Sequence, residues 1–87
     1  MPYLQIFRNN SNPFYNYTVI KGNELYEVRV IEGEKMKWRY VGEIDPDVYK
    51  VDGVLIYKPS MQMISIFQKI LKPPVKEGFK SFKKWLK

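Results

Sequence analysis

The sequence predicts an α+β domain in which an antiparallel β-meander of five or six strands is followed by one or two C-terminal helices packed on the sheet. Over residues 1–57, short runs of β-branched and aromatic residues alternate with polar ones between turn residues, as in antiparallel strands. After Pro59 and Ser60 the apolar spacing changes to that of a helix. With 87 residues, 45% of them hydrophobic, the chain suffices for one small folded domain.

Four runs are predicted as strands, at residues 3–8, 14–21, 24–32 and 35–41. Gly22 and Asn23 predict a two-residue type II′ turn, which sets Tyr17 opposite Val28 and Val19 opposite Tyr26. A three-residue loop at 32–34 then sets Val28 opposite Trp38, because a slip by one residue would move the apolar set to the wrong face. The predicted apolar face consists of Tyr15, Tyr17, Val19, Tyr26, Val28, Val30, Met36, Trp38 and Tyr40.

A second hairpin is predicted from residues 48–51 and 54–57, which would turn at Asp52 and Gly53. The Asp-Gly pair is a strong signal for a type I′ turn. A sheet of this kind followed by a terminal helix resembles the small basic chromatin proteins with SH3-like barrels. That resemblance implies an SH3-like barrel as the alternative to an open sheet.

The helical part divides at Pro73 and Pro74. Residues 60–72 predict a helix that Ser60 caps and that covers the apolar face of the sheet, so residues 1–72 form one domain. The two prolines end this helix, and residues 73–87 predict a basic amphipathic helix beyond a Pro-Pro hinge. Its apolar side carries Phe79, Phe82, Trp85 and Leu86.

Charge is distributed unevenly along the chain. Residues 1–57 hold seven Lys and Arg against eight Asp and Glu, whereas residues 58–87 hold eight Lys against one Glu. The first part therefore has a net charge of −1 and the second of +7. Such asymmetry indicates a polyanionic partner, either a nucleic acid or an anionic membrane surface.

Catalytic chemistry is sparse in this sequence. Without Cys or His, thiolate nucleophiles, imidazole acid–base catalysis and Cys/His zinc sites are excluded, and we expect no enzyme, cofactor or metal. We interpret the carboxylates of Glu43, Asp45, Asp47 and Asp52 as turn formers, since they lack the other ligands of a calcium loop. The N-terminus lacks a signal peptide and no apolar run is long enough to span a bilayer, which predicts a cytoplasmic protein.

The basic residues therefore carry the functional prediction, which is sequence-independent binding of DNA or RNA. The predicted phosphate contacts are Lys76, Lys80, Lys83, Lys84 and Lys87 in the last helix and Arg29, Lys37 and Arg39 on the reverse face of the sheet. For the sheet, the alternative interpretation is a solvated face on which Glu27 pairs with Arg39 across the strands.

The alternative function is an interaction module. In that case Phe79, Phe82, Trp85 and Leu86 would bind a protein partner, a second copy of the chain or a membrane surface.

Overall fold

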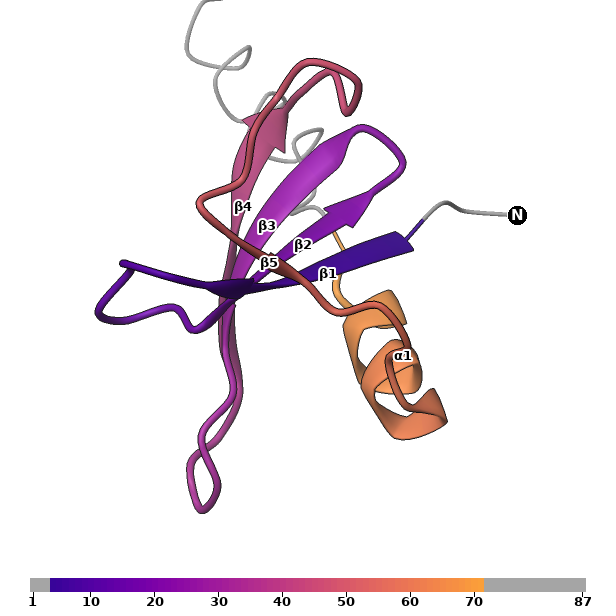
Figure 1. The fold of residues 1–87 in the computed structure, drawn as a ribbon. Coiled ribbons are helices and arrows are strands. Elements are labelled where there is room, and N and C mark those ends of the chain that lie inside the picture. The colour runs from indigo at the N-terminus through magenta and orange to yellow at the C-terminus, as the bar shows by residue number, and fades with distance from the viewer. Residues whose placement is uncertain (1–3, 72–87) are drawn as a thin grey trace, which may run out of the picture.

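The computed structural model describes residues 4–71 and shows an open antiparallel sheet with one short helix (Figure 1). The elements are β1 (Leu4–Asn9), β2 (Tyr17–Lys21), β3 (Glu24–Arg29), β4 (Lys37–Glu43), β5 (Gly53–Leu55) and α1 (Met61–Gln68). The strand order is β4-β3-β2-β1-β5, so β4 and β5 form opposite edges and do not pair within the described residues. The predicted antiparallel sheet is confirmed, and the predicted second helix lies outside the described residues.

The predicted registers are confirmed over most of the meander, but a bulge between Leu25 and Tyr26 shifts the β3–β4 register by one residue, so that Leu25 pairs with Gly42. Tyr17 pairs with Val28 and Val19 with Tyr26 between β2 and β3, and Val28 pairs with Trp38 between β3 and β4. Gly22 has a φ of 66°, and among residues 4–71 no residue other than glycine has a positive φ, so Asn23 has the negative φ that a type II′ turn at Gly22 and Asn23 requires. The register was predictable because the turn and the apolar pattern specify the same pairing.

The core lies between α1 and one face of the sheet. Ser60 caps the helix by accepting a hydrogen bond from the backbone N–H of Met63 at 3.1 Å, as predicted. The Phe67 ring lies 5.6 Å from the Tyr17 ring, so the helix packs directly on β2. The buried cluster consists of Ile6, Val19, Tyr26, Val28, Phe67 and Ile70.

The Lys21 side chain, from β2, forms hydrogen bonds with the end of α1. Its Nζ donates hydrogen bonds to the backbone carbonyl of Gln68 at 2.9 Å and to that of Ile70. A cation at the C-terminal carbonyls of a helix also complements the helix dipole. Burial lowers the pKa of Lys21, against a smaller opposing effect of Glu24. The helix ends at Gln68 and not at residue 72 as predicted.

The prediction of a second hairpin at Asp52 and Gly53 was wrong. Residues 48–51 are not a strand, and Gly53–Leu55 pairs with β1 instead, with Gly53 opposite Asn9. A Cβ atom on Gly53 would lie 2.7 Å from the backbone oxygen of Arg8. Glycine is therefore needed here for the close approach of β1 and not for a type I′ turn.

The connection from β4 to β5 covers the second face of the sheet. It runs from one edge of the sheet to the other and passes over the face opposite α1 (Figure 1). Ile20 and Leu25, which lie on that face, are buried. The connection thereby brings Asp52 next to the loop that follows β1, which positions the site described below.

Candidate nucleic-acid interface

The loop between β1 and β2 is held by asparagine side chains. Asn12 Oδ1 accepts hydrogen bonds from the backbone N–H groups of Phe14 at 3.0 Å and Tyr15 at 2.9 Å, and Asn9 Nδ2 donates to the carbonyl of Tyr15 at 2.7 Å. The Asn16 side chain bonds both the N–H and the carbonyl of Val30, at 2.9 and 2.8 Å. The amide of Asn16 thus replaces the backbone pairing that would have extended β2.

As a result, Tyr15 does not lie on the apolar face, and its predicted place in the core was wrong. The Tyr15 ring lies edge-on to Phe14, with 4.8 Å between the ring centroids. It also lies 5.3 Å from the guanidinium carbon of Arg39, which belongs to the reverse face of the sheet.

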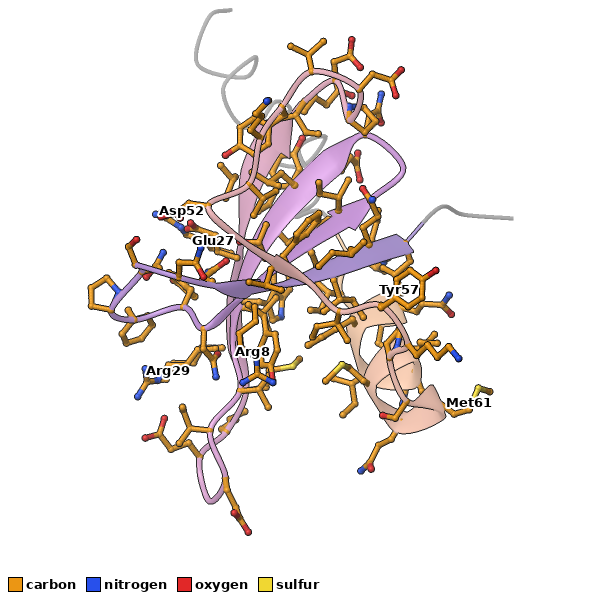
Figure 2. All side chains as sticks on the ribbon, viewed as in Figure 1. Arg8, Glu27, Arg29, Asp52, Tyr57 and Met61 are labelled. Carbon is orange, nitrogen blue, oxygen red and sulfur yellow. The ribbon has the colours of Figure 1, made fainter. Side chains whose placement is uncertain are left out.

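The three predicted basic residues of the sheet gather around these two rings. The guanidinium carbon of Arg29 lies 4.6 Å, and Lys37 Nζ 5.8 Å, from the centre of the Phe14 ring. Phe14 is 43% exposed despite these neighbours. We call Phe14, Tyr15, Arg29, Lys37 and Arg39 the aromatic-basic surface. Figure 2 shows Arg29 next to the loop that carries Phe14.

Two of these three cations also have carboxylate partners. Arg39 Nη2 lies 2.6 Å and its Nε 2.7 Å from Oε1 of Glu27, and this hydrogen-bonded pair raises the pKa of Arg39. The predicted cross-strand pair is therefore present. Arg29 Nε lies 3.1 Å from Glu34 Oε1. Within residues 4–71, Lys37 forms no salt bridge.

A polar cavity of about 300 Å³ adjoins the aromatic-basic surface. It lies between the β1–β2 loop, the reverse face of the sheet and the β4–β5 connection. Its lining residues are Asn9, Ser11, Asn12, Thr18, Leu25, Glu27, Tyr49, Val51 and Asp52. Glu27 and Asp52, from β3 and from the connection, point toward the same region (Figure 2).

Hydrogen bonds order the polar groups of this cavity. Asp52 accepts from Ser11 Oγ at 2.6 Å and from Asn10 Nδ2 at 3.3 Å. Asn12 Nδ2 donates to Glu27 Oε2 at 3.3 Å, and the buried Thr18 hydroxyl donates to Asn9 Oδ1 at 2.5 Å. The cavity is thus a preorganised set of amides, hydroxyls and carboxylates.

The sequence predicts residues 9–13 only as a connection between strands, whereas in the structure Asn9, Ser11 and Asn12 line the cavity. The signal in the sequence is an asparagine-rich stretch at residues 9–12 followed by two adjacent aromatic residues, Phe14 and Tyr15. Asparagine side chains in loops commonly form hydrogen bonds with nearby backbone groups, so the sequence predicts that such bonds order this loop.

The acidic residues of the β4–β5 connection form a turn. Asp45 accepts hydrogen bonds from the backbone N–H of Asp47 at its side chain and from those of Val48 and Tyr49 at its carbonyl. No group of three or more His, Cys, Asp or Glu residues is arranged to hold a metal ion in residues 4–71.

An apolar region lies on the opposite side of the molecule. A second cavity, of about 240 Å³, opens between α1 and the sheet beside Tyr17, Val30 and Phe67. Near the start of α1, Tyr57 is 85% and Met61 81% exposed. No helix within the described range is long and apolar enough to cross a membrane.

The remaining predicted site residues lie outside the described residues: Lys76, Lys80, Lys83, Lys84 and Lys87, and the apolar Phe79, Phe82, Trp85 and Leu86. Searches with the sequence and the structure found no matching protein-family model, curated protein or solved structure.

Proposed function

We propose that this chain is a small non-enzymatic nucleic-acid-binding protein that contacts phosphates largely independently of base sequence. The observation that carries the proposal is the convergence of Arg29, Lys37 and Arg39 on the exposed ring of Phe14 and the half-buried ring of Tyr15. Cationic side chains neutralise phosphates, and aromatic rings stack on bases. A surface that combines both is typical of proteins that bind nucleic acid strands.

The distribution of charge supports the same function and assigns most of the phosphate contacts to the C-terminal segment. Residues 4–71 hold nine Lys and Arg against eight Asp and Glu, for a net charge of +1. Residues 72–87 hold six Lys against Glu77 alone, for a net charge of +5. In this proposal most of the affinity comes from five lysines of the C-terminal segment, Lys76, Lys80, Lys83, Lys84 and Lys87. The aromatic-basic surface positions the nucleic acid strand.

Charge reversal in the full-length chain tests this assignment. Lys80→Glu, Lys83→Glu and Lys84→Glu together should abolish binding of fluorescent DNA at low salt while circular dichroism shows an intact fold. The matched control combines Lys50→Glu, Lys58→Glu and Lys69→Glu, which changes the net charge equally but elsewhere in the chain. Equal loss in both triple variants would show that net charge alone attracts the DNA, without a localised site.

The exposed apolar side chains of Val54, Tyr57 and Met61 favour a second candidate function, a module that binds a protein partner, a second copy or a membrane surface. In this case Phe82→Ala with Trp85→Ala should stop association with the partner, with itself or with anionic vesicles. Sedimentation and vesicle flotation measure these outcomes. DNA binding that persists in this double variant would favour the first function.

A further inference from the structure

The cavity beside the aromatic-basic surface has the opposite electrostatic character. Among residues 4–71, no Lys or Arg lines it, whereas the carboxylates of Glu27 and Asp52 do. A phosphate placed there would face two negative groups, so the repulsion excludes it. The cavity therefore suits a group that donates hydrogen bonds and carries no negative charge.

The size and lining of the cavity narrow the class of ligand further. Its volume of about 300 Å³ lies at the lower end of the range for small-ligand pockets, so the cavity has room for one flat heterocycle. Leu25 and Val51 supply apolar wall, and Tyr49, which is partly exposed, supplies an aromatic ring. A flat heterocycle with polar edges matches this combination of an apolar wall and a polar rim.

The cavity and the aromatic-basic surface share one wall. Glu27 lines the cavity and binds Arg39 on the adjoining surface, while Asn12 lines the cavity and holds the backbone of Phe14 and Tyr15. A strand whose phosphates contact Arg29, Lys37 and Arg39 therefore runs along the rim of the cavity. A base can turn into the cavity only when it is unpaired, because a base in a duplex is stacked and paired.

We propose that this cavity binds an unpaired nucleobase that carries an exocyclic amino group, so that the preferred ligand is single-stranded nucleic acid. The inference rests on the proposed function. Carboxylates accept hydrogen bonds from amino groups such as N4 of cytosine, whereas thymine offers a carbonyl oxygen at the same position. Asp52 and Glu27 thus favour cytosine over thymine.

The test compares oligo-dC with oligo-dT of equal length on the full chain by fluorescence anisotropy. We expect oligo-dC to bind roughly threefold to tenfold more tightly, which is the range for the net contribution of one typical hydrogen bond. Asp52→Asn should reduce this ratio toward unity, since the amide also donates to thymine. Asp47→Asn is the matched control: it removes the same charge from the same connection, but its side chain does not line the cavity. This control should keep the ratio.

The direction in which the affinity changes distinguishes recognition of the base from binding of the phosphates alone. If phosphates alone were bound, both variants would raise the affinity for both oligonucleotides equally, because each removes a negative charge. A second variant, Val51→Phe, fills the cavity without changing charge and should also abolish the preference for oligo-dC. Circular dichroism checks that each variant is folded, and oligo-rC beside oligo-dC shows whether RNA or DNA is the source of the base.

Failure of the inference and failure of the proposed function are distinguishable. Equal affinities for oligo-dC and oligo-dT in the unmodified protein, or a ratio unchanged in folded Asp52→Asn and Val51→Phe, would overturn the inference and leave nucleic-acid binding intact. No binding of either oligonucleotide at low salt would overturn the proposed function itself.

Discussion

Thr18 is a single residue on which the order of the candidate interface depends. It is 6% exposed, and its hydroxyl donates to Asn9, whose amide in turn holds the carbonyl of Tyr15. Thr18→Val should cost about 1–3 kcal/mol, because it leaves the Asn9 oxygen without this donor. Urea denaturation measures the loss. Thr18→Ser keeps the hydroxyl and serves as the control, and a Thr18→Val protein as stable as the parent would contradict the assigned hydrogen bond.

The lowered pKa of Lys21 predicts that the stability of the protein depends on pH. Burial lowers its pKa in the folded state below the ordinary value of 10.5. Between these two values the unfolded chain binds more protons, so the free energy of unfolding rises with pH. Lys21→Arg remains protonated, and the stability of the parent relative to this variant should therefore rise as the pH approaches 10.5.

Urea denaturation of both proteins at a series of pH values checks this prediction. A constant or falling difference would show that the carbonyl acceptors of Gln68 and Ile70 offset the cost of burial.

At the residue scale, a side-chain pair that follows from strand register is predictable from the sequence. A side chain that makes the hydrogen bonds of a backbone group is not. The pair between Glu27 and Arg39 follows from the register of β3 and β4. Tyr15 does not continue the alternation of β2, because the Asn16 amide takes over the pairing with Val30. Neither the alternation of apolar residues nor strand propensity indicates that the Asn16 side chain, and not a backbone group, pairs with Val30.

At the scale of the element, β5 depends on a glycine at its first residue. Gly53→Ala would place a Cβ atom 2.7 Å from the backbone oxygen of Arg8, and the displacement of β1 from β5 should cost about 1–3 kcal/mol. Val54→Ala is the control, because Val54 lies in the same strand and is 61% exposed. Thermal unfolding measures both. Equal melting temperatures for the two variants would contradict the close approach of these strands.

A second prediction for an element concerns the packing of α1 on the sheet. Phe67 is buried against Tyr17, so Phe67→Ala should cost about 3–5 kcal/mol through lost burial and the cavity it leaves. Met61 lies on the same helix and is 81% exposed, so Met61→Ala should change stability by less than about 0.5 kcal/mol. Chemical denaturation gives both values. A small effect at Phe67 would mean that α1 does not pack on the sheet as described.

The turns predicted at Gly22 and at Gly53 show why one element was predictable and another was not. Gly22 turns between strands that are neighbours in sequence, so local chemistry determines the pairing. Asp52 instead accepts hydrogen bonds from Asn10 and Ser11, residues about forty positions earlier, and Gly53 pairs with β1. A contact between segments so distant in sequence is set by the whole fold, which local turn preferences do not encode.

At the scale of the whole molecule, a nearly neutral stretch, residues 4–71, is followed by a strongly basic one. The described residues contribute a net charge of +1 and residues 72–87 a net charge of +5. The sequence alone was enough to locate this asymmetry. It did not indicate the polar cavity, because the cavity forms only where the β1–β2 loop, the sheet and the β4–β5 connection meet.

The salt dependence of DNA binding tests the central claim most directly. Neutralising five phosphates should make the logarithm of the affinity fall with the logarithm of salt concentration at a slope of roughly −4 to −5 on duplex DNA and about −3.5 on a single strand. Lys80→Glu, Lys83→Glu and Lys84→Glu together should flatten that slope. A full-length protein that binds no polyanion at low ionic strength, or whose binding is independent of salt, would contradict the account.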